Sequence, residues 1–227
     1  VTACYPDVRA LKLCLLQASS RDGVNANGMI SGNCPENTYP LDYVFIWFTG
    51  AMSYFKVTGD KPLLQLLFSR AKRCLDYIVE KTTAAGLKTS ATGCGKVVDW
   101  GYRPPPATTA GGVDITMNCF FLLALDAMVE WCTILGQDAA TYKTAHSTVS
   151  MAMRKRIAQQ AAMQPRQQIL EPELAEDEEG WVVVKQDEGA VEEDAPHLGA
   201  AAGGLESVDW STIGYHAASM ALAAGLL

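Results

Sequence analysis

The sequence lacks several features that would point to a particular class of protein. Its 227 residues contain no uninterrupted apolar run of the roughly 18 residues that a membrane span needs. No two of its seven cysteines have the C-x-x-C spacing of zinc or redox sites, and the Asp-x-Asp spacing of calcium loops is absent. Lys and Arg are scattered, without a basic face. We therefore expect no metal or other cofactor, no membrane and no nucleic-acid partner.

The ends of the sequence also lack familiar signals. The opening VTACYPDV has neither the basic start nor the apolar core of a signal peptide, and the first residue is Val1. The last apolar segment stops at Leu227 in the middle of its pattern. We expect the chain to be an internal segment of a longer protein.

Acidic residues are concentrated in one stretch. The formal net charge is −7, but residues 171–194 hold eleven acidic residues and one basic residue, Lys185, which leaves the remainder at +3. Only WVVVK (181–185) in this region resembles a strand. Such a composition buries too little apolar surface to order itself. We expect residues 161–204 to form a disordered insertion between a helical part, 1–160, and a further helix within 205–227.

Five segments show the spacing of apolar residues by three and four that predicts helices. They are residues 8–19, 42–57, 61–80, 113–135 and 139–160. The first is expected to point its apolar side chains inward, namely Leu11, Leu13, Cys14, Leu15 and Leu16. The second begins with Asp42, a candidate N-cap. The cysteines at 14, 74, 119 and 132 fall within these segments, where a free thiol behaves as a small buried hydrophobe.

The helical pattern contains a weak internal repeat. An aromatic helix ends at YFKVTGD (54–60), a second apolar helix ends at WCTILGQD (131–138), and an amphipathic helix follows each. Gly59 and Gly136 suit the left-handed residue that closes a helix. A helix that is apolar all round must be buried. The repeat therefore predicts αα-hairpins that form an inner layer of helices inside an outer one.

Four segments resemble, in order, parts of the bacterial α-L-rhamnosidases, which are six-hairpin glycosidases. They are VRALKLCLLQASSRDG (8–23), YPLDYVFIWFTGAMSYFKVTGD (39–60), VVDWGY (97–102) and YHAASMALAAGLL (215–227). The resemblance implies an all-α fold of αα-hairpin repeats that form part of an (α/α)6 barrel. It also implies that a sugar binds at one end of the inner helices, so carbohydrate is the expected partner.

The resemblance further implies the hydrolysis of terminal α-L-rhamnosides, or a related glycoside, with inversion. Inversion needs a protonated and an ionised carboxyl group about 6.5–9.5 Å apart, with a water molecule between the second carboxyl and the sugar. The acid and base motifs of the family match no position of this sequence. We therefore expect the catalytic carboxylates to lie outside the chain, and this segment to be inactive alone.

The candidates for sugar binding lie in loops and at helix starts. Trp100 offers a flat apolar face and Asp99 can accept hydrogen bonds from hydroxyl groups, although Trp100 could instead cap the core beside three prolines. Tyr102 follows in the same loop. Asp42 and Trp47 begin an aromatic helix after a loop, and their alternative roles are an N-cap and a core residue.

Other polar residues have a simpler explanation. His216 lies among small residues, where a histidine is typically a hydrogen-bonded packing residue, and Glu36 fits a solvated turn. The acidic stretch lacks the rigid framework that catalysis needs. It supports instead a second hypothesis, in which the chain is a non-catalytic helical scaffold whose acidic segment binds a basic partner.

Overall fold

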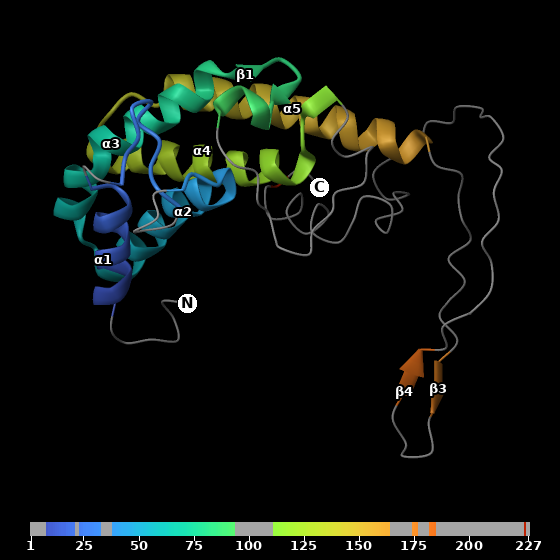
Figure 1. Ribbon diagram of the computed structural model, residues 1–227, viewed down its shortest axis with the longest axis horizontal. Coiled ribbons are helices and arrows are strands. Elements are labelled where there is room, and N and C mark those ends of the chain that lie inside the picture. Colours follow the sequence, from blue (N-terminus) through green and yellow to red (C-terminus); the bar gives the residue numbers. More distant parts are fainter. Residues whose placement is uncertain are drawn as a thin grey trace. The chain divides into compact units, whose positions relative to one another are not determined.

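Helices dominate the computed structural model, which describes residues 8–20, 23–32, 38–93, 111–163, 174–176, 182–184 and 225. The helices are α1 (Arg9–Ala18), α2 (Leu41–Thr58), α3 (Lys61–Glu80), α4 (Ile115–Leu135) and α5 (Ala140–Met163) (Figure 1). Their ends lie within three residues of the predicted ones, and the predicted all-α fold is confirmed. The chain divides into two compact units, Val1–Ile157 with Trp210–Leu227, and Ala158–Asp209.

Both predicted hairpin turns are present. Gly59 and Gly136 follow α2 and α4 with φ angles of 67°, in the left-handed region that favours glycine. The Gly59 N–H donates to the Phe55 carbonyl at 2.7 Å. This carbonyl in the last turn of α2 thereby gains a hydrogen-bond partner at the end of the helix. In Figure 1, α3 runs back from the end of α2 and α5 runs back from the end of α4, and the inner helices α2 and α4 run in the same direction.

The first unit has two layers, as predicted. The inner helices α2 and α4 pack against each other, and the ring centroids of Phe45 and Phe121 lie 5.3 Å apart. The outer helices each bury one stripe of side chains at helical spacing. The stripe of α3 consists of Leu63, Leu64, Leu67, Ala71, Cys74, Leu75 and Ile78. The stripe of α5 consists of Tyr142, Ala145, Val149, Met153 and Ile157.

Two predictions of burial were wrong. On α1 only Leu15 is buried, whereas Leu13 is 64 % exposed and Cys14 is exposed as well. The predicted inward residues point to all sides of this short helix, and α1 packs on α2 through one side. The apolar helix α2 is not buried all round, because Ile46 is 44 % and Val57 is 57 % exposed. The helices α1, α3 and α4 cover its other sides.

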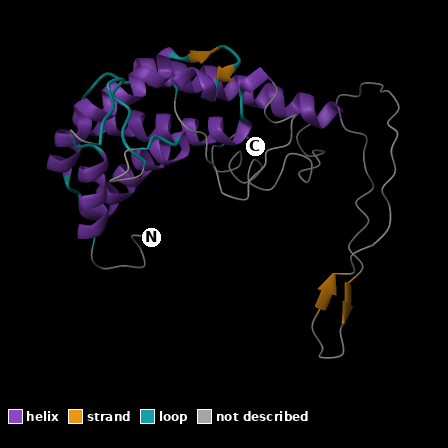
Figure 2. Ribbon diagram, in the orientation of Figure 1, coloured by secondary structure: helices purple, strands orange, loops and turns teal. Residues whose placement is uncertain are grey.

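Short strands complete the described structure (Figure 2). In the first unit, β1 (Thr82–Thr83) pairs antiparallel with β2 (Gly86–Leu87), and the 3₁₀ helix η1 (Thr89–Thr92) follows. In the second unit, β3 (Leu174–Glu176) pairs antiparallel with β4 (Val182–Val184). The predicted strand within 181–185 is thus confirmed as β4, and its partner β3 was missed because it lies in the acidic stretch. Apart from these strands and the end of α5, residues 161–204 lie outside the described residues.

Helix α4 has the length and apolar composition of a membrane span, the single such helix in the described part of the chain. A buried core helix passes the same test. Thirteen side chains of α4 are buried, and among its apolar residues stand Asp126 and Glu130. The apolar composition of α4 is therefore explained by its burial as a helix of the inner layer.

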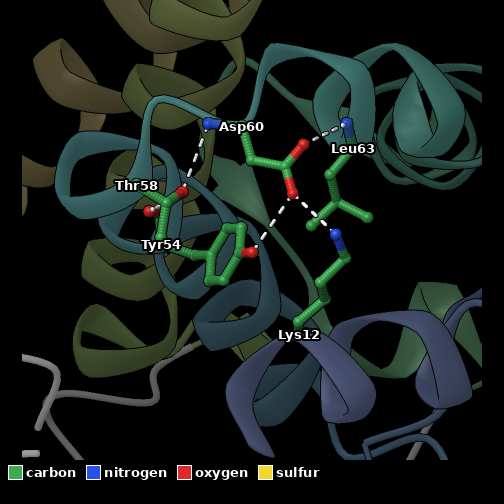
Figure 3. Close-up of polar contacts among 5 residues, drawn as sticks. All are labelled: Lys12, Tyr54, Thr58, Asp60 and Leu63. Atoms are coloured by element: carbon green, nitrogen blue, oxygen red, sulfur yellow. Dashed lines mark hydrogen bonds and ion pairs between the residues drawn. The ribbon is translucent and has the colours of Figure 1, made fainter. Parts of the chain in front are cut away.

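Asp60 ties three helices together (Figure 3). It stands at the N-cap of α3, where one carboxylate oxygen accepts from the Leu63 N–H at 3.1 Å. The other oxygen accepts from the Tyr54 hydroxyl of α2 at 3.1 Å and from Nζ of Lys12 of α1 at 2.7 Å. The hydrogen bond from Lys12 is the main cause that lowers the pKa of Asp60. The turn after α2 therefore also anchors α1.

Replacing Asp60 by Ala should lower the free energy of unfolding at pH 7 by about 2 kcal/mol. About 1 kcal/mol comes from the lost cap and about 1 from the Tyr54 hydrogen bond. The pKa of Asp60 is lowered in the folded chain, so its contribution is present above its ordinary pKa of about 4 and fades as the pH falls further. Urea unfolding at pH 7 and pH 3 measures both effects.

Two other variants serve as references for this experiment. Asp60→Asn keeps a capping oxygen and should lose less than Asp60→Ala. Lys72→Met breaks the solvent-exposed Lys72–Asp76 ion pair on α3 and should cost little. If Asp60→Ala were as stable as wild type at pH 7, the hydrogen bonds of Asp60 would not stabilise the junction.

Candidate functional site

The two inner helices begin at the same end of the first unit, and each begins with a buried aspartate. Asp42 lies one turn before Phe45 on α2, and Asp114 lies two turns before Phe121 on α4. Since Phe45 and Phe121 are in contact, both carboxyl groups belong to the end at which the inner helices start. The resemblance predicts sugar binding at one end of these helices, and this end carries the buried carboxyls.

Asp42 is a buried carboxyl group with an unused oxygen. Its exposed fraction is 1 %, and its Oδ1 has no hydrogen-bond partner within the described residues. Burial raises the pKa of Asp42, although hydrogen bonds from the backbone N–H groups of Tyr43 and Asp42 itself oppose the shift. A buried polar oxygen without a partner is rare and often marks a functional group or a bound molecule. Asp42 can therefore donate or accept one more hydrogen bond, depending on its protonation.

The prediction that Asp42 caps α2 was wrong. Pro40 occupies the N-cap position and makes no side-chain capping hydrogen bond. Asp42 lies within the first turn, where a negative charge still interacts favourably with the helix dipole. Its carboxyl group is thus not needed for capping.

The face of α2 that carries Asp42 is otherwise open. Helical spacing places Ile46, Thr49 and Ser53 on the same side as Asp42, and Ile46 and Ser53 are exposed. A Cβ atom built on Gly50, which also lies near this side of α2, would meet no atom of the described residues within 4 Å. The described residues therefore leave part of this side of α2 uncovered.

Trp47 lies in the core between α1 and α4. It is 7 % exposed, its indole N–H donates to the Leu15 carbonyl at 3.2 Å, and its ring lies 5.9 Å from that of Trp131. A separation of five residues turns it about 140° around the helix from Asp42. The structure therefore does not bring Asp42 and Trp47 together, and Trp47 is placed as a packing residue.

Asp114 is a buried polar residue that the sequence analysis missed. Its exposed fraction is 0 %, and its Oδ1 accepts from the Met117 N–H at 3.1 Å, which makes it the N-cap of α4. Burial, and to a smaller extent the charge of Asp114, raise the pKa of Cys119 to about 12. The sequence could have indicated Asp114, because it directly precedes the second apolar helix much as Asp42 stands at the start of the first.

Two more buried polar residues, Thr116 and Asn118, follow on the first turn of α4, and both are 0 % exposed. The amide of Asn118 is hydrogen-bonded on both sides, to Leu87 of β2 and to the Asp114 carbonyl. The buried polar side chains of α4 are therefore gathered at its start.

The other predicted site residues lie outside the described residues. These are Asp99, Trp100 and Tyr102, as well as the weaker candidates Glu36 and His216. The chain on both sides of the first three is described, and there Lys88 and Val113 form an antiparallel bridge. In the described part of the chain, no group of three or more His, Cys, Asp or Glu side chains could hold a metal ion.

The chain matches a known protein family. A sequence model of the bacterial alpha-L-rhamnosidase 6 hairpin glycosidase domain covers residues 7–177, which include all the helices described above. No curated protein and no solved structure matches the chain.

Proposed function

Because the chain belongs to the bacterial α-L-rhamnosidase six-hairpin glycosidase domain family, we propose that it forms the sugar-binding part of an enzyme that hydrolyses terminal α-L-rhamnosides with inversion. The family match over both αα-hairpins carries this proposal. The helical part, 1–160, and the segment 205–227 belong to one barrel, and the acidic segment 161–204 is an insertion. A carbohydrate is the partner.

The sugar binds at the end where the inner helices begin. Asp42 supports this placement, because its carboxyl is buried, carries a raised pKa and has an unused oxygen. A hydroxyl group of a sugar supplies the missing hydrogen bond at low cost in desolvation, since the carboxyl has already left water. Trp47 stabilises the helices that carry the site, because it joins α1 to the inner helices.

The loop residues complete the site. Trp100 gives the sugar ring an apolar surface, Asp99 accepts from its hydroxyl groups, and Tyr102 adds a further polar edge. The segment with these residues leaves β2 and returns to the start of α4, at the end where Asp114 lies. Loops at the ends of a rigid helical framework are the usual position of binding residues.

Substitutions of the loop residues test the proposed function. In the chain of residues 1–227, Trp100→Ala and Asp99→Asn should each weaken the binding of methyl α-L-rhamnoside at least about tenfold, or roughly 1.4 kcal/mol, because they remove the apolar surface and a charged acceptor. Isothermal titration calorimetry gives the dissociation constants. Trp181→Ala is the matched control, since Trp181 lies beyond the residues that match the family. Unchanged affinity in both loop variants would make the loop structural.

A further inference from the structure

An open cavity of about 440 Å³ lies between the outer helix α3 and the turn at residues 25–28. It is lined by Asn27 of the turn and by six residues of α3 between Ser69 and Glu80, all of them described. These six recur at spacings of three and four residues, so they share one side of the helix. The volume falls within the range of about 300–1,000 Å³ that is usual for ligand sites. Asp42 does not line this cavity.

The turn that forms one wall of the cavity is fixed in place. Oδ1 of Asn25 accepts from the Asn27 N–H at 3.0 Å, and Nη2 of Arg73 donates to the Ala26 carbonyl at 2.8 Å. Gly28 has a φ angle of +86°, and a Cβ atom there would lie 2.7 Å from Cγ of Arg73. Only glycine therefore lets the turn lie so close to α3 without strain. A wall that is already ordered reduces the entropy lost on binding a ligand.

Tyr77 supplies the aromatic ring of the cavity. Its hydroxyl accepts from Nδ2 of Asn27 at 3.3 Å and donates to the Thr92 carbonyl at 3.1 Å, which fixes the ring between α3, the turn and η1. Nζ of Lys81 lies 5.3 Å from the ring centroid. The half-buried side chain thus presents a rigid apolar body beside polar groups.

The charges that line the cavity balance. The two cations are Lys72 and Arg73, and the two carboxylates belong to Asp76 and Glu80. Lys72 pairs with Asp76, whereas Glu80 and the Ser69 hydroxyl have no partner among the described residues. Arg73 has five N–H groups, and its contact with the turn uses one of them. The cavity therefore offers free donors and free acceptors without a net charge.

We propose that this cavity is a second carbohydrate site, which binds one neutral sugar residue of a glycan. A sugar hydroxyl both donates and accepts, so it can donate to Glu80 and accept from Arg73. The ring of Tyr77 covers an apolar patch of the sugar. An anion would meet the carboxylates of Asp76 and Glu80, and a cation would meet Lys72 and Arg73, so neither is favoured.

The site goes beyond the proposed function, because it lies on the outer helix α3 and takes no part in hydrolysis. A second contact of this kind raises the effective concentration of a glycan near the chain. It can therefore be weak by itself and still help to hold a ligand that carries several sugar residues.

The test is an NMR titration of the chain of residues 1–227 with methyl α-L-rhamnoside and with methyl β-D-glucoside. At least one of them should shift the side-chain amide signal of Asn27 and the backbone amide signal of Glu80. Glu80→Ala should weaken this binding at least about fivefold, and Ser69→Ala should weaken it less, because hydrogen bonds to a carboxylate are the stronger ones. Both side chains are exposed, so both variants should fold.

Glu130→Ala is the matched control, because Glu130 is an exposed carboxylate of α4 outside the cavity, in a surface ion pair with Lys56. It should bind as wild type does. The proposal is overturned if neither sugar shifts the Asn27 signal, if inorganic phosphate alone shifts it, or if Glu80→Ala leaves the affinity unchanged. The backbone amide signal of Asp42 reports the end of the inner helices in the same titration. A sugar that shifts only this signal would overturn the second site and leave the proposed function standing.

Discussion

Residues 1–227 expressed alone are expected to release no measurable alcohol from an aryl α-L-rhamnoside. Inversion needs one carboxyl that gives a proton and a second that activates water. In the described residues burial raises the pKa of Asp42, but Asp114, the other buried carboxyl at this end, caps α4. Each missing acid or base group typically costs a factor of about 10²–10⁴ in rate. A spectrophotometric assay beside an active α-L-rhamnosidase measures the difference.

The assay also has an outcome that contradicts this expectation. Turnover by the isolated chain, at a rate within about a hundredfold of the reference enzyme, would place both carboxyls inside residues 1–227. Asp42→Asn and Glu36→Gln would then be the first substitutions, because each keeps the shape of the side chain and removes its acidity. Calorimetry with L-rhamnose on the same sample is the control, since a folded chain can bind the sugar without hydrolysing a glycoside.

Replacing Trp131 by Ala should lower the free energy of unfolding by about 3–5 kcal/mol, the usual cost of removing a large buried aromatic ring. The ring is 0 % exposed and lies between Trp47 of α2 and Phe68 of α3, at centroid distances of 5.9 and 6.5 Å. Its indole N–H donates to the Leu64 carbonyl at 3.2 Å. One side chain therefore joins both inner helices to an outer one, and its loss leaves a cavity among them.

Urea unfolding followed by far-ultraviolet circular dichroism measures this loss. Leu66→Ala is the matched control, because Leu66 lies on α3 beside the same region but is 59 % exposed. It should change the free energy of unfolding by no more than about 0.5 kcal/mol. Equal effects of the two substitutions would show that α2, α3 and α4 do not share the core around Trp131.

The sequence predicted the helices well because their signals are local. Apolar spacing located all five, and Gly59 and Gly136 located the hairpin turns, since a residue with positive φ is most often a glycine. Burial was harder to predict. Whether Leu13 or Ile46 meets a neighbour depends on which helices surround it, and the spacing within one helix does not contain that information.

The site was predicted less completely for a related reason. Asp42 was identified by its place after a loop, but its role as a cap was wrong because the helix begins one residue earlier. Asn118 could not be found from sequence, since its partners on Leu87 lie 31 residues away in the chain. An amide within a helix does not signal such a contact until the fold brings it to its partner.

The order of the helices along the chain has a consequence for the order of folding. The α2–α3 and α4–α5 pairs join neighbours in sequence across short turns, so each can form as a local event, at little entropic cost. The contact of Phe45 with Phe121 joins residues on either side of α3 and the β1–β2 hairpin, and it closes a much longer loop. We therefore expect the two αα-hairpins to form early and to dock late. Because Leu87 and Asn118 lie on opposite sides of that docking step, we expect the end at which the inner helices begin to be the last part to acquire its shape.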